Sequence, residues 1–301
     1  MSFRIAVGII CCSAVVLSGA GCAQKAGASG ESRMVPIGST KADLFGMPAE
    51  YRALHPRLEE CFGRMVRFQA QPDGPALGKQ LELGNIPYAL MSAGEYAAIP
   101  DTGKLTLVAS GVNALDKTSH KAYVVVKAGS HVKTISDCSG KRFAFGTYGD
   151  LLTDTAARSA LEKAGVPVKK LLIELVPPPL NLEGRLYLKN DTATTIAFDP
   201  TVNAGVIDEI VYSRMPESGG NLITGPSKDQ FTIVGETVPV PEMVVVAGPA
   251  AEPELTAKFK SFLINKVKDD KLICDQLGIK GFAEPDKAAY DMVRTLAPPK
   301  S

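Results

Sequence analysis

Short apolar runs alternate with helix-like segments along most of the chain. The apolar runs, each with the length of a buried strand, lie at 35–38, 65–69, 86–91, 105–112, 122–127, 142–145 and 171–176. Segments with apolar residues at helical spacing lie at 48–61, 75–83, 151–164, 252–268, 270–277 and 286–296. Strands that alternate with helices in this way predict an α/β fold with mostly parallel sheets.

The order of these segments predicts two lobes. The long strands at 105–112 and 122–127 lead straight into a second β–α–β set, and a strand-rich segment at 231–247 precedes the C-terminal helices. A chain that builds one lobe, then a second, and then returns has two crossings, which together form a hinge beside a cleft. We expect the first lobe at 34–122 and 226–301, and the second at 123–225.

The first residues have the pattern of a secretory leader. Arg4 is followed by an apolar run at 5–17 and then by small residues up to Cys22. A basic start, an apolar core and a small-residue end are typical of a signal peptide. The run is too short to cross a bilayer, which takes about 20 apolar residues. We expect a signal peptide at 1–21 and a periplasmic or extracytoplasmic location.

Residues 17–22 (LSGAGC) resemble a bacterial lipoprotein cleavage box, in which the cysteine is lipidated and becomes the new N-terminus. The resemblance implies a lipid anchor on Cys22. Residues 22–33 would then form a flexible tether, because they are mostly small and polar. Gly19 stands where the usual box has a large aliphatic residue, so cleavage by an ordinary signal peptidase is the alternative.

Composition and motifs exclude several function classes. The net charge is +1, and no dense basic run interleaved with aromatic residues occurs, so we expect no nucleic-acid binding. The sequence has no phosphate loop, dinucleotide fingerprint, nucleophile elbow or zinc-protease motif. His55, His120 and His131 belong to no metal or catalytic pattern. We therefore expect no enzyme, no cofactor and no metal.

Three cysteines follow the leader, namely Cys61, Cys138 and Cys274. Export places them in an oxidising compartment, where an odd number allows at most one disulfide within the chain. Isolated semi-buried thiols are the favoured alternative, and the spacing excludes a CxxC metal or redox motif.

Four stretches together resemble the phosphate/phosphite/phosphonate substrate-binding proteins of ABC transporters. They are 84–96 (GNIPYALMSAGEY), 139–146 (SGKRFAFG), 203–208 (NAGVID) and 277–282 (LGIKGF), the last followed by Tyr290 and Asp291. The resemblance implies a two-lobed type 2 periplasmic-binding-protein fold with a central cleft and a two-strand hinge. It also implies a monomer with a small solute as ligand and an ABC permease as partner.

The resemblance breaks at the ligand site. In open α/β sheets, ligands lie beyond the carboxyl ends of strands, against helix N-termini that favour anions. In the family, an S-T-S-G run at such a helix start holds the phosphonate oxygens, and the register here places residues 150–153 (DLLT) at that point. Both serines are missing, and Asp150 is a good N-cap that would repel an anion. We expect phosphonate and phosphate to bind weakly or not at all.

The expected ligand-binding residues lie in or beside these stretches. Asp208 matches a family carboxylate that faces the cleft and can hold an amino group, so Asp150 and Asp208 together would favour a cationic or zwitterionic ligand. The alternatives are a plain N-cap for Asp150 and core packing for Tyr123. The full expected set is Ser92, Tyr96, Tyr123, Thr147, Tyr148, Asp150, Thr153 and Asp208.

We therefore expect the solute-binding protein of an ABC importer, with a phosphonate-type scaffold and an altered ligand site. An orphan or sensory ligand-binding lipoprotein, not coupled to transport, is the alternative. An enzyme on the same scaffold is the third hypothesis, and the lack of a recognisable nucleophile–base pair counts against it. The sequence does not identify the ligand.

Overall fold

The computed structural model describes residues 34–41, 49–175 and 192–296. The expected signal peptide at 1–21 and the expected anchor at Cys22 with its tether at 22–33 lie outside the described residues. In the described ranges, no helix is long and apolar enough to cross a membrane.

Within these ranges, six strands form one sheet in the order β13-β4-β12-β3-β1-β2. Strand β1 pairs in parallel with β2 and β3, whereas β12 runs antiparallel to β3 and β4, and β13 antiparallel to β4. The bounds are β1 Met34–Ser39, β2 Met65–Ala70, β3 Tyr88–Met91, β4 Thr106–Val112, β12 Val244–Ala247 and β13 Gly281–Ala283.

Five described strands form a second sheet in the order β10-β6-β9-β7-β8. Strand β7 pairs in parallel with β8 and β9, and β6 runs antiparallel to β9 and β10. The bounds are β6 Ala122–Lys127, β7 Arg142–Phe145, β8 Leu172–Leu175, β9 Ala204–Asp208 and β10 Phe231–Glu236.

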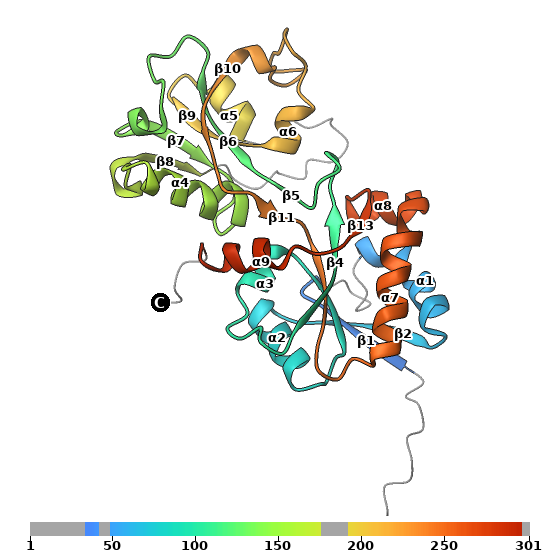
Figure 1. Ribbon diagram of the computed structural model, residues 1–301. Helices are drawn as coiled ribbons and strands as arrows, with labels where there is room; N and C mark the ends of the chain where they lie inside the picture. Colours follow the sequence, from blue (N-terminus) through green and yellow to red (C-terminus); the bar gives the residue numbers. More distant parts are fainter. Residues whose placement is uncertain (1–33, 42–48, 176–191, 297–301) are drawn as a thin grey trace, which may run out of the picture. The chain divides into compact units, whose positions relative to one another are not determined.

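The two segments that pass between the sheets pair with each other. Strand β5 (Ser119–His120) follows β4 of the first sheet and precedes β6 of the second, whereas β11 (Val240–Pro241) lies between β10 and β12 on the way back (Figure 1). They form an antiparallel ribbon in which Val240 faces His120. This ribbon is the two-strand connection that the sequence predicts as a hinge.

Helices cover both faces of the first sheet, because its central strands β3 and β12 are apolar on both sides. Successive residues of a strand point to opposite faces, so Val244 and Val246 pack into the cluster that holds Tyr96 of α3 and Tyr290 of α9. Val245 packs into the other cluster, with α1, α7 and α8. The helix bounds are α1 Leu54–Phe62, α2 Gly74–Glu82, α3 Ala93–Ala97, α7 Pro253–Lys266, α8 Lys271–Leu277 and α9 Lys287–Arg294, with short 3-10 helices η1 Ala49–Tyr51 and η6 Val267–Asp269.

The second sheet is covered in the same way. Phe143 and Phe145 pack on the side of α4, and Ala144 packs on the opposite side with Ile196 of α5. The bounds are α4 Ala157–Lys163, α5 Thr192–Phe198 and α6 Glu209–Ser213, with the π-helix η3 Leu151–Ala156 leading into α4. Three further short 3-10 helices are described, namely η2 Ile135–Cys138, η4 Val168–Lys170 and η5 Lys228–Gln230.

The α/β class predicted from the sequence is confirmed. The segment expected as one helix at 48–61 instead holds η1 and α1, and the helix expected at 151–164 begins as a π-helix. The return to the first lobe was placed at 226, whereas β10 extends the second sheet by pairing with β6. We therefore propose that the chain returns after Glu236, where β11 joins the ribbon.

Candidate functional site

A cavity of about 920 Å³ lies where parallel strands of both sheets end. Thr40 follows β1, Ser92 follows β3, Thr147 follows β7, and Asp208 is the last residue of β9. The ribbon residues His120 and Val240 complete one side. This is the place where open α/β folds bind ligands, because helix N-termini and loops converge there.

Helices α2, α3, α6 and η3 all begin at this cavity, and a carboxylate occupies each N-terminus. Asp73 accepts a hydrogen bond from the Ala76 N–H (2.8 Å), and Asp208 accepts one from the Ile210 N–H (2.6 Å). At α3, Glu95 accepts from the Ser92 N–H (2.6 Å) while the Glu95 N–H donates to the Ser92 hydroxyl (3.2 Å). Such caps satisfy N–H groups that the helix itself leaves without partners.

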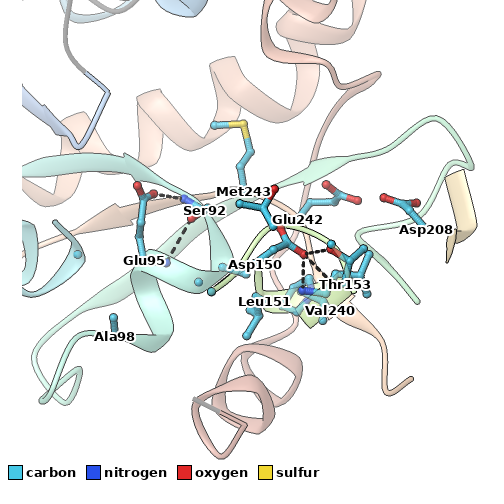
Figure 2. A pocket seen from close by; sticks show the side chains of 18 of the residues that line it. Ser92, Glu95, Ala98, Asp150, Leu151, Thr153, Asp208, Val240, Glu242 and Met243 are labelled. Carbon is cyan, nitrogen blue, oxygen red and sulfur yellow. Dashed lines mark hydrogen bonds between the residues drawn. The ribbon is translucent and has the colours of Figure 1, made fainter. Parts of the chain in front are cut away.

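The cap on η3 is the most complete. Oδ1 of Asp150 accepts hydrogen bonds from the Leu152 N–H (3.1 Å), the Thr153 N–H (2.6 Å) and the Thr153 hydroxyl (2.8 Å). The N–H of Gly149 donates to Asp154, whose carboxylate also pairs with Arg158. Figure 2 shows the Asp150–Thr153 bonds beside the Ser92–Glu95 pair. The N–H groups of Gly149, Leu152 and Thr153 are therefore used by the chain's own carboxylates.

His120 lies between two carboxylates at the ribbon. Its Nε2 atom is 3.3 Å from Oδ2 of Asp208, and its Nδ1 atom is 2.7 Å from Oε1 of Glu242, at an angle too bent for a regular hydrogen bond. The side chain is 12% exposed. Burial lowers the pKa of His120, but the contacts with Asp208 and Glu242 outweigh it and raise the pKa to about 10. The imidazole is therefore charged at neutral pH.

The structure brings five of the eight predicted binding residues to the cavity and places three elsewhere. The five are Ser92, Thr147, Asp150, Thr153 and Asp208.

The three residues placed elsewhere are tyrosines. Tyr96 is 1% exposed and packs edge-on against Tyr290, with 5.6 Å between ring centroids. Tyr123 is half-buried and packs edge-on against Tyr212, as the core alternative for it predicted. Tyr148 is 79% exposed and does not line the cavity.

Sequence reasoning missed Glu95, Glu242 and the role of His120. The spacing Ser92-x-x-Glu95 is a capping-box signature and could have identified Glu95. Nothing local marks Glu242, because its partner His120 lies 122 positions earlier in the chain.

The described ranges contain three cysteines, together with other residues of the types that bind metal ions. No cluster of three or more His, Cys, Asp or Glu side chains there could hold a metal ion. Cys61, Cys138 and Cys274 are buried and free, as the alternative of isolated thiols predicted. Burial raises the pKa of all three thiols, that of Cys138 to about 11.

Solved structures share this fold. XAC2383 of Xanthomonas citri, solved with chloride or with ATP, gives a TM-score of 0.63 for the chloride form at 14% identity, over 88% of this chain and 96% of that one. PhnD1 of Prochlorococcus marinus, solved with methylphosphonate, gives 0.57 at 16% identity over 88% and 97% of the two chains.

A binding protein of an ABC phosphonate transporter from Pseudomonas aeruginosa gives 0.54 at 15% identity, over 87% and 85%. At these identities the similarity shows the fold alone, and it confirms the two-lobed binding-protein architecture.

A search of curated proteins gives no match. A family model does match, with the description "ABC transporter, phosphonate, periplasmic substrate-binding protein", over residues 46–290. This range covers most of the chain, including both sheets apart from β1 and all of the described cavity lining except Thr40. The chain therefore belongs to the phosphonate family of periplasmic substrate-binding proteins of ABC transporters.

Proposed function

We propose that this protein is the solute-binding component of an ABC importer whose ligand site no longer accepts phosphonate or phosphate. The main support for this proposal is that the carboxylate of Asp150 accepts hydrogen bonds from the N–H groups of Leu152 and Thr153. The family resemblance puts phosphonate oxygens at this helix start. A ligand anion that bonds to these two N–H groups would have to displace the cap, because Asp150 already uses them.

Charge repulsion adds to the loss of donors. Two unit charges about 4 Å apart repel by about 1 kcal/mol in water and about 4 kcal/mol at the effective dielectric constant of ~20 near a protein surface. Since about 1.4 kcal/mol corresponds to a tenfold change in Kd, Asp150 alone would weaken phosphonate binding by roughly fivefold to a thousandfold. Asp208 does not add to this effect in full, because its charge is paired with His120.

The cellular setting is part of the proposal. We propose that Cys22 carries a lipid that holds the protein at the membrane, near its permease, and that the ribbon of β5 and β11 serves as the hinge. The protein would act as a monomer. Changing Cys22 to Ala should release the protein from the membrane fraction of cells that express the full chain.

Calorimetric titration of the mature protein with methylphosphonate and phosphate tests the altered site. The wild type should show no tight, saturable binding of either anion. Asp150→Ser keeps an N-cap, since serine caps as well as aspartate, but it removes the charge, and it should raise the methylphosphonate affinity at least about fivefold. The matched control is Asp286→Ser, which changes the same kind of cap at α9, outside the cavity. Tight binding of either anion by the wild type would refute the proposal.

A further inference from the structure

The described lining of the cavity is strongly acidic. It contains five carboxylates and one histidine, and no lysine or arginine belongs to the part of the lining that the structure describes. The carboxylates are Asp73, Glu95, Asp150, Asp208 and Glu242.

The positive groups nearby do not offset this charge. His120 is paired with Asp208 through Nε2 and with Glu242 through Nδ1. Lys121, the next residue along the chain, is paired with Glu236 outside the cavity. Lys41, which follows the lining residue Thr40, pairs with Glu50. Asp73, Glu95 and Asp150 therefore have no cationic partner among the described residues.

Two of these carboxylates, Asp73 and Asp150, have one oxygen that accepts no hydrogen bond from a described residue. All three hydrogen bonds that Asp150 accepts end on Oδ1, and the one that Asp73 accepts also ends on Oδ1. No described residue donates a hydrogen bond to Oδ2 of either side chain. Both residues are exposed in the cavity, so each offers a charged acceptor to a ligand donor. Charge-assisted hydrogen bonds of this type are the strong ones.

The lining also distinguishes between kinds of cation. Quaternary ammonium ligands are held by cages of Trp, Tyr and Phe through cation–π contacts, and no described lining residue is one of these three types. The walls offer carboxylate oxygens and threonine hydroxyls instead, such as those of Thr147 and Thr192. Such groups accept the N–H donors of a primary or secondary ammonium group, which a quaternary ammonium lacks.

The two carboxylates with an unused oxygen follow strands of different sheets. Asp73 lies at the start of α2 after β2 of the first sheet, and Asp150 lies at the start of η3 after β7 of the second. We propose that the cavity binds a linear diamine or polyamine, with one protonated amine at Asp73 and Glu95 and another at Asp150. This assignment rests on the proposed solute-binding function and names its ligand class. The same carboxylates that exclude an anion hold the ligand.

Titration calorimetry and thermal shift of the mature chain with putrescine and spermidine test the assignment, with choline and methylphosphonate as comparison ligands. We expect saturable binding of at least one of the two amines and at least tenfold weaker binding of choline. Asp150→Asn and Asp73→Asn should each weaken amine binding at least tenfold, since asparagine preserves the N-cap and removes only the charge. Asp286→Asn, the same change at a helix start outside the cavity, should leave the affinity unchanged.

The possible failures are distinguishable. Choline that binds as tightly as the amines, or amine binding that neither asparagine variant weakens, would overturn the assignment. Tight binding of a neutral solute, or of an anion other than phosphonate or phosphate, with none of either amine, would also overturn it but leave the solute-binding function intact. If a broad screen found no saturable solute, both the diamine assignment and the proposed function would fall.

Discussion

Replacing His120 with glutamine should destabilise the protein, and the loss should depend on pH in a defined direction. His120 is charged and lies between Asp208 and Glu242 with a side chain that is only 12% exposed. Glutamine has similar polarity but no charge. It would leave the two carboxylates close to each other with their charges uncompensated.

The pKa of His120 sets the size of this effect. It rises from an ordinary value of 6.5 to about 10, because the two carboxylates outweigh the effect of burial. At about 1.4 kcal/mol for each tenfold change in the ionisation constant, the charged imidazole contributes at most about 5 kcal/mol of stability. Removal of one partner from a buried ion pair costs about 3–5 kcal/mol in other proteins. We therefore expect a loss of about 3–5 kcal/mol at pH 6.

The sign of the pH dependence follows from linkage. Because the folded protein holds the proton more tightly than the unfolded chain, the contribution is complete below pH 6.5 and is lost as the pH rises to about 10. The difference in unfolding free energy between wild type and His120→Gln should thus be largest at pH 6 and close to zero at pH 10.5.

Urea unfolding of both proteins between pH 6 and pH 10.5 measures this difference directly. Titrating groups that do not contact His120 are common to both proteins and cancel in the comparison. His131→Gln changes an exposed histidine and should be neutral at every pH. A His120→Gln difference below about 1 kcal/mol at pH 6, or one that stays constant up to pH 10.5, would refute the ion cluster of His120, Asp208 and Glu242.

Three further predictions concern packing and thiols. Gly146→Ala would place a Cβ against Thr153, 2.6 Å from its Cβ, and should cost about 1–3 kcal/mol in thermal unfolding. Tyr290→Phe removes a hydroxyl 2.7 Å from the buried Ser110 hydroxyl and should cost about 1–3 kcal/mol in urea unfolding; no change would mean that the bond is not made. Cys138 is fully buried with a pKa raised by burial, so it should react with Ellman's reagent at pH 8 far more slowly in the folded than in the unfolded protein; equal rates would contradict the buried thiol.

Local patterns allowed much of the fold to be predicted from the sequence. The strands β6 and β7 have the predicted bounds, because their runs of valine and phenylalanine are buried on both faces. The helix α3 was missed, since five residues are too few to show a helical period. We propose a second crossing later than the one expected at 226, because a sequence cannot show that β10 pairs with β6, about a hundred positions away.

In the site too, features set by neighbouring residues could be predicted, and features set by contacts between distant segments could not. An aspartate before an apolar helical segment marks an N-cap wherever it occurs, so the role of Asp150 could be inferred from its neighbours alone. The ion cluster could not, because β5, β9 and the segment after β11 meet only when both crossings have formed. Tyr96 was expected in the cleft because its position along the chain does not show which way its side chain points. It follows a strand end, as binding residues do, but α3 turns its ring into the core against Tyr290.

The proposed change of ligand class requires no change of fold. A helix start is an anion site only while its N–H groups lack partners, and the side chain at the N-cap decides whether they do. With serine there, the hydroxyl and the free donors can take an anion. With Asp150 there, its Oδ1 atom uses the N–H groups of Leu152 and Thr153, and Oδ2 of the same carboxylate is left as an acceptor for a cation. Asp73 has the same arrangement at the start of α2. The scaffold can thus keep its sheets, its ribbon and the family pattern while one type of side chain at the helix starts reverses the charge of the solute that fits.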